Sequence, residues 1–153
     1  MLEPLFFALG LANSLFLLFI FIIRRNHLEL LKKVGWLYLL LAIPAVAGLL
    51  LVRQEGKDYR YTVFLLIFLA FLAIEALYDW ILKLPFREQA DWRILTPYLV
   101  LYMSMNYGFV MMVWKYTSLA GGILLLVLFI LQLITNLLTH PPAAAGDGKS
   151  RMK

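Results

Sequence analysis

The stretch YTVFLLIFLAFLAI, residues 61–74, places fourteen uncharged residues in a row, and EALYD, residues 75–79, follows it directly. The run has none of the alternation between apolar and polar residues that a half-buried β-strand requires. A helix needs about 20 mostly apolar residues to cross the hydrocarbon core of a bilayer, a length that this run reaches when it is extended to residue 82. The stretch therefore predicts a membrane-spanning helix over 61–82.

The composition of the whole chain agrees with a membrane protein. Hydrophobic residues make up 63% of the 153 residues and charged residues 15%, against about one half and about one quarter in soluble globular proteins. So few polar side chains cannot cover the surface of a water-soluble domain. Because the apolar runs are continuous, we expect an all-α integral membrane protein, and not a membrane β-barrel.

Five apolar runs are long enough to span a bilayer, which predicts a bundle of five transmembrane helices. Residues 115–118, KYTS, are interpreted as a tight turn, because one helix over 95–139 would be about 65 Å long at about 1.5 Å per residue. Pro44 is expected to kink the second span. Residues 1–140 would form this five-helix domain, and residues 141–153, rich in small and breaker residues, a disordered C-terminal tail. The expected spans are 3–23, 34–52, 61–82, 95–114 and 119–139.

The distribution of Lys and Arg predicts the orientation of the bundle, because short cytoplasmic loops collect these residues. An outside N-terminus and a cytoplasmic C-terminus place ten basic residues on the cytoplasmic side and four outside. The expected location is the plasma membrane or an inner membrane. Since the basic residues stand at span ends, contact with anionic membrane lipids explains the net charge of +5 better than a nucleic-acid partner. The four outer residues are Arg53, Lys57, Arg60 and Lys115.

Missing residue types exclude several chemistries. The chain has no cysteine, which excludes thiol–disulfide exchange and thiolate metal sites. Its histidines, His27 and His140, stand beside expected span ends, which argues against a buried haem held by two histidines. We therefore expect neither a metal site nor a cofactor.

Glu75 is the charged residue that most needs an explanation inside an expected span. It lies about 5 Å past the midpoint of a 61–82 helix on the cytoplasmic side, and Asp79 lies on the same face about 6 Å further along. An ionisable group near mid-bilayer costs about 2.5–3.5 kcal/mol on insertion scales, so it normally faces a cavity or a partner. Asp79 has an alternative role as an interfacial partner of Lys83, whereas Glu75 is the candidate catalytic or binding group.

Two other expected spans carry polar side chains at helical spacing. Residues 98, 102 and 106 form one stripe, and residues 132 and 136 form another, at depths close to those of Glu75 and Asp79 respectively. Buried polar groups seek partners, so we expect both stripes to converge with the two acids, joined by Asn13 and Ser14 from the first span. The predicted ligand-binding residues are Glu75, Asp79, Tyr98, Tyr102, Asn106, Gln132 and Asn136.

Three functions can use such a cluster. In the leading hypothesis the protein binds a small amphiphilic, lipid-like or cationic molecule. A broader version of this hypothesis is that the protein also transports the molecule. The alternatives are a membrane enzyme in which Glu75 acts as acid or base on a lipophilic substrate, and a non-catalytic subunit of a homo-oligomer or larger membrane complex. The amides also have a structural interpretation, because interhelical hydrogen bonds worth about 0.6–2 kcal/mol hold membrane helices together.

Overall fold

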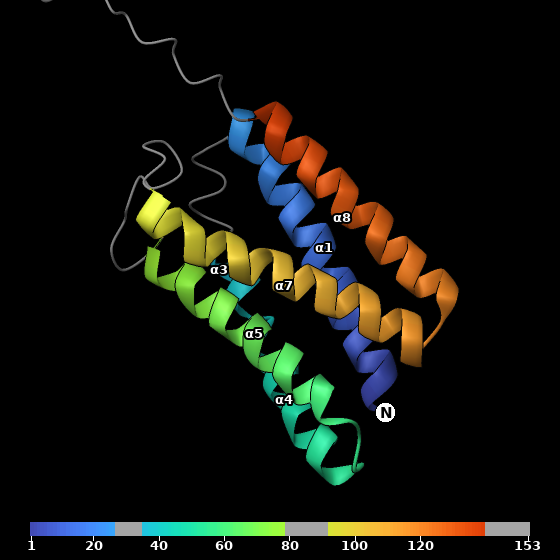
Figure 1. The fold of residues 1–153 in the computed structure, drawn as a ribbon. Helices are drawn as coiled ribbons and strands as arrows, with labels where there is room; N and C mark the ends of the chain where they lie inside the picture. Colours follow the sequence, from blue (N-terminus) through green and yellow to red (C-terminus); the bar gives the residue numbers. More distant parts are fainter. Residues whose placement is uncertain (27–34, 79–91, 140–153) are drawn as a thin grey trace, which may run out of the picture.

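The computed structural model describes residues 1–26, 35–78 and 92–139, and over these residues it contains helices and no strand (Figure 1). The all-helical prediction is therefore confirmed for this part of the chain. Asp79 and the expected tail at 141–153 lie outside the described residues. The helices are α1 (Leu2–Asn26), α3 (Trp36–Leu39), α4 (Ala42–Gln54), α5 (Tyr59–Ala76), α7 (Trp92–Tyr116) and α8 (Leu119–Thr139).

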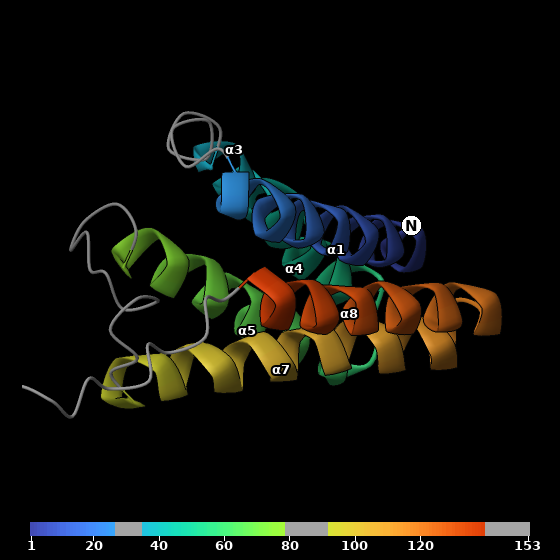
Figure 2. The same ribbon diagram turned by 90° about the horizontal axis from the view of Figure 1, so that it is seen from above.

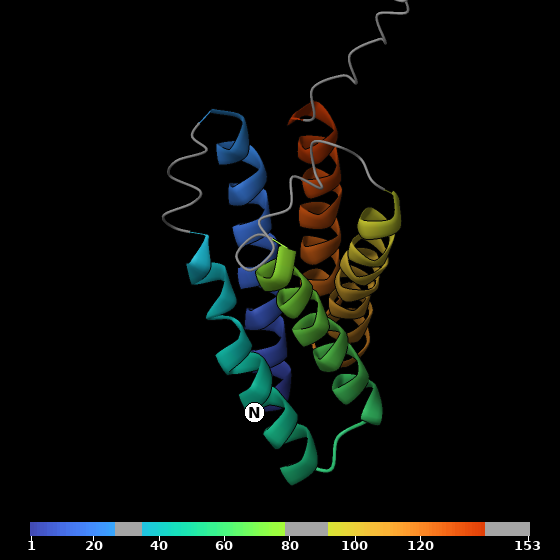
Figure 3. The same cartoon turned by 90° about the vertical axis from the view of Figure 1, so that its left-hand side faces the viewer.

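The long helices run up and down in one bundle (Figure 3). α1 packs against α4, α7 and α8, while α5 packs against α4 and α7. Seen from above, α1 and α7 lie on opposite sides of the view with α8 between them, and α8 contacts both (Figure 2). This arrangement gives both α1 and α7 three helical neighbours.

Four helical segments are long and apolar enough to cross a membrane: Leu2–Ile23, Trp36–Gln54, Tyr59–Ala76 and Leu119–Leu138. Large apolar side chains remain exposed on their outer faces, as at Ile43 (68% exposed) and Leu137 (75%). Such a surface suits contact with lipid. α7 is not among these four, because tyrosines and polar residues such as Asn106 interrupt its apolar run. The count of five spans and the orientation of the termini thus remain predictions.

The second expected span is two helices in the structure, with α3 ending at Leu39 and α4 beginning at Ala42. Pro44 has no backbone N–H, so the usual bond to the carbonyl of Leu40 cannot form, and that carbonyl accepts instead from the N–H of Ile43 at 3.0 Å. The break agrees with the expected kink at Pro44.

α8 lies close against the backbone of α7 at Gly122. A Cβ atom added there would lie 2.8 Å from the Cα of Trp114, which is shorter than the 3.0 Å below which Cβ contacts essentially never occur. Ser118 precedes α8, and its hydroxyl accepts a hydrogen bond from the N–H of Gly121 at 3.0 Å. The tight pair of helices therefore depends on glycine at one position and on a serine cap before the helix.

One end of the bundle, here called the amino-terminal end, is closed by polar contacts. Lys57, in the turn between α4 and α5, forms a 2.8 Å ion pair with Glu3 of α1. Asp58 caps α5 by accepting from the N–H of Arg60 at 3.0 Å, and it also accepts from the Tyr116 hydroxyl of α7 at 2.7 Å. These contacts bind the N-terminus of α1, the α4–α5 turn and the end of α7 to one another.

The hydrogen bonds at Asp58 predict a pH dependence of stability. The backbone bond from Arg60, and after it the bond from Tyr116, lower the pKa of Asp58. A lowered carboxyl pKa stabilises the fold above the pKa of the unfolded chain, and this contribution is lost as the pH falls from about 5 to about 3. Asp58→Asn keeps the cap but cannot titrate. The melting temperature of purified Asp58→Asn in detergent should therefore fall less steeply over this range than that of the wild type; equal slopes would contradict the role given to Asp58.

Candidate functional site

A chain of hydrogen bonds joins three helices in the middle of the bundle. The Tyr102 hydroxyl of α7 donates to Oε1 of Gln132 of α8 at 2.9 Å, and Nε2 of Gln132 donates to the carbonyl of Ser14 of α1 at 3.3 Å. Gln132 is fully buried and Tyr102 is 3% exposed. The expected meeting of the α7 and α8 stripes with Ser14 thus occurs through these side chains.

Asn106 plays a more local part in this network. Its Nδ2 donates to the carbonyl of Tyr102, one turn earlier in α7, at 2.9 Å. The bond lies within one helix, so it does not by itself tie α7 to a neighbour. Asn106 is 2% exposed, and its side chain adds polarity to the interior beside Tyr102.

Glu75 lies in the last turn of α5, 6% exposed. Phe71 stands one turn earlier on the same face. The ring of Phe71 lies 5.2 Å from that of Tyr98 and 6.1 Å from that of Tyr102, both on α7, and 6.4 Å edge-on from that of Tyr38 on α3. Glu75 therefore stands one helical turn beyond Phe71, whose ring belongs to a group of aromatic rings from α3, α5 and α7.

Tyr38 is the residue that sequence reasoning missed. Near a span end it resembles an interfacial tyrosine, yet it is only 2% exposed, and its hydroxyl donates to Oδ1 of Asn13 at 2.6 Å. The break before Pro44 leaves α3 as a separate short helix within the second predicted span. Pro44 is visible in the sequence, but the inward position of Tyr38 is not.

The predicted site residues thus fall into two groups. Tyr102, Asn106 and Gln132 belong to the central hydrogen bonds, whereas Tyr98 packs on Phe71, which stands one turn before Glu75 on α5. Asn136 is half-buried one turn beyond Gln132 on α8. Asp79 lies outside the described residues. We call the second group, with Asn13 and Tyr38 added, the Glu75 cluster; it comprises Asn13, Tyr38, Phe71, Glu75 and Tyr98.

The Glu75 cluster combines an acid, aromatic faces and an amide in an interior of low dielectric. Charge pairs and hydrogen bonds are stronger there than in water. Aromatic faces attract organic cations, and a nearby carboxylate adds to that attraction. Among the described residues there is no group of three or more His, Cys, Asp or Glu side chains that could hold a metal ion.

Comparison of the chain with models of protein families gives no match, and comparisons with curated proteins and with solved structures give none either. The functional assignment therefore depends on the chemistry of the Glu75 cluster and of its surroundings.

The hydrogen bond between Tyr102 and Gln132 should be energetically measurable. Tyr102→Phe and Gln132→Leu each break it, so a double-mutant cycle on unfolding should give a coupling energy of about 0.5–2 kcal/mol. The control cycle pairs Gln132→Leu with Tyr107→Phe, a tyrosine of α7 that is 58% exposed, and should give a coupling near zero. Equal coupling in the two cycles would show that Tyr102 has no specific link to α8.

Proposed function

We propose that this protein is a small multi-pass membrane protein that binds a small amphiphilic organic cation at the Glu75 cluster. The burial of Glu75 one turn from Phe71, whose ring contacts three tyrosines, is the observation that supports this most directly. The attraction between a carboxylate and a cation is strong in an interior of low dielectric. An organic cation suits both the Glu75 carboxylate and the aromatic rings that precede it on the same face.

The surface of the bundle supports the amphiphilic part of the proposal. Exposed apolar side chains cover the outer faces of α4 and α8, so a ligand with a hydrocarbon tail can reach the protein from the lipid phase. Its head group would leave the interface for the Glu75 cluster while its tail stays in an apolar environment. A fully hydrophilic cation would gain nothing from this surface.

The central hydrogen bonds have a supporting role in this proposal. Gln132 is held by both Tyr102 and the Ser14 carbonyl, so these groups already satisfy one another. We assign them to fixing α7 against α1 and α8, which keeps the rings of Tyr98 and Tyr102 in place beside Phe71. A pre-organised site binds more tightly because less conformational entropy is lost on binding.

Replacing Glu75 should separate binding from folding. Glu75→Gln keeps the shape but removes the charge, so affinity for N-decyl-N,N-dimethyl-N-propylammonium should fall by about tenfold or more. The melting temperature should change by less than about 3 °C. Binding is measured by isothermal titration calorimetry in a maltoside detergent.

The matched control for this measurement is Glu55→Gln, which removes a carboxylate at the amino-terminal end and should leave the affinity unchanged. An unchanged affinity of Glu75→Gln would refute the site. A large fall in its melting temperature with normal affinity would favour the structural interpretation of Glu75.

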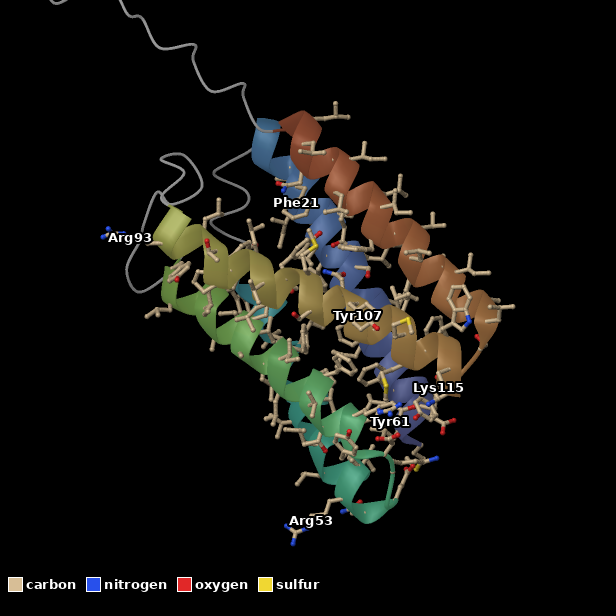
Figure 4. The ribbon with its side chains drawn as sticks, in the orientation of Figure 1. Phe21, Arg53, Tyr61, Arg93, Tyr107 and Lys115 are labelled. Atoms are coloured by element: carbon tan, nitrogen blue, oxygen red, sulfur yellow. The ribbon has the colours of Figure 1, made fainter. Side chains whose placement is uncertain are left out.

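We also propose that α7 is a fifth span and that the amino-terminal end faces outside. Figure 4 supports this placement, because Arg93 at the start of α7 lies at the opposite end of the bundle from Arg53 and Lys115. The central hydrogen bonds support it too. They join Tyr102, near the middle of α7, through Gln132 of α8 to Ser14, near the middle of α1, so α7 lies alongside two apolar helices that are long enough to span a membrane. A cytoplasmic opposite end agrees with the excess of Lys and Arg expected there.

The absence of native cysteine permits a direct test of this topology. A membrane-impermeant maleimide added outside intact cells should label Gln54→Cys and Thr117→Cys, because both positions are exposed at the amino-terminal end. Arg93→Cys should react only after the membrane is permeabilised. Outside labelling of Arg93→Cys together with Thr117→Cys would mean that α7 does not cross the membrane.

A further inference from the structure

Asn13 has a buried hydrogen-bond donor that nothing in the described structure uses. Its side chain is fully buried, and Nδ2 has no hydrogen-bond partner in residues 1–26, 35–78 or 92–139. Oδ1 accepts from Tyr38 at 2.6 Å, which fixes the orientation of the amide. The Nδ2 group, on the other side of the amide, is therefore left as the free donor of this side chain within the described residues.

The neighbouring groups in the described residues do not accept a hydrogen bond from Nδ2 of Asn13. The carbonyl of the adjacent Ser14 accepts from Nε2 of Gln132, and Oε1 of Gln132 accepts from Tyr102; neither oxygen accepts from Nδ2 of Asn13. Leaving a buried amide donor unpaired costs free energy, so such groups in native proteins usually meet water or a ligand. Asn13 thus calls for an oxygen acceptor that residues 1–26, 35–78 and 92–139 do not supply.

The other buried polar atom without a partner in the described residues is the hydroxyl of Tyr61, and it belongs to a different region. Tyr61 packs edge-on against Phe6 at the amino-terminal end, with ring centroids 5.0 Å apart. Phe6 in turn contacts Phe109 at 5.0 Å, and Phe109 contacts Phe68 at 5.4 Å. These almost fully buried rings form an apolar layer between Tyr61 and Asn13, so one ligand head group would not serve both.

We infer that the ligand of the Glu75 cluster carries, besides its positive charge, an oxygen acceptor that takes a hydrogen bond from Nδ2 of Asn13. This inference rests on the proposed function. A hydroxyl or carbonyl two or three bonds from a cationic nitrogen reaches Asn13 when the nitrogen lies against the ring of Tyr38, whose hydroxyl contacts Asn13. The ligand class is thus narrowed from amphiphilic cations to amphiphilic cations with a polar oxygen near the charge, such as alkylated amino alcohols.

Two probes that differ in one group test this assignment. N-decyl-N-(2-hydroxyethyl)-N,N-dimethylammonium carries a hydroxyl where N-decyl-N,N-dimethyl-N-propylammonium carries a methyl group. The full-length wild type should bind the hydroxyl probe about tenfold more tightly, as expected for one hydrogen bond to a buried donor. In Asn13→Leu the ratio of the two affinities should fall to about one.

Two further variants keep the test decisive. Asn13→Ala replaces Asn13→Leu where leucine does not fit, with the same expected ratio. Ser14→Ala, which leaves the backbone carbonyl that Gln132 uses, should keep the tenfold preference.

The outcomes separate this inference from the proposed function. If the wild type binds both probes equally, Asn13 donates no hydrogen bond to the ligand and the inference is overturned, while the cation site stands. If Asn13→Leu and Asn13→Ala retain the preference for the hydroxyl probe, another residue recognises the oxygen. If the wild type binds neither probe, the proposed function itself fails.

Discussion

Polar groups buried in an apolar bundle must find partners, and the interior of this protein is organised by that constraint. The amide of Gln132 meets it by accepting from Tyr102 and donating to the Ser14 carbonyl, so one side chain of α8 ties α7 and α1 together. Apolar side chains pack on lipid about as well as on one another, and therefore these few bonds fix the register of the helices more specifically than the apolar contacts do.

The interior has three zones along the bundle axis. Ion pairs and hydrogen bonds of Glu3, Lys57 and Asp58 close the amino-terminal end. The rings of Phe6, Phe68 and Phe109 form an apolar layer beneath them, and the Glu75 cluster lies beyond that layer. The aromatic layer separates the cluster from the closed end. A ligand is therefore expected to approach from the opposite end or from the lipid around it.

Helical spacing was sufficient to predict the parts of the site that lie on long regular helices. The two polar stripes were expected to converge because each repeats every four residues and both lie in the inner half of the expected spans, and the structure joins Tyr102 to Gln132. Spacing could not predict Tyr38, because its place depends on the break before Pro44 and on the packing of α3. It also could not rank the partners of Glu75, since the packing of α5 against α4 and α7 is a property of the assembled bundle.

Photoaffinity labelling tests directly whether the Glu75 cluster binds an amphiphilic cation. A decylammonium probe with a diazirine beside its nitrogen would be cross-linked to the protein in maltoside detergent, and the labelled peptides identified by mass spectrometry. If the cation binds at the Glu75 cluster, the segments around Phe71 and Tyr98 should be labelled, and an excess of unlabelled decyltrimethylammonium should suppress this labelling. Labelling confined to exposed residues such as Ile43 and Leu137, and unaffected by the competitor, would contradict binding at the cluster.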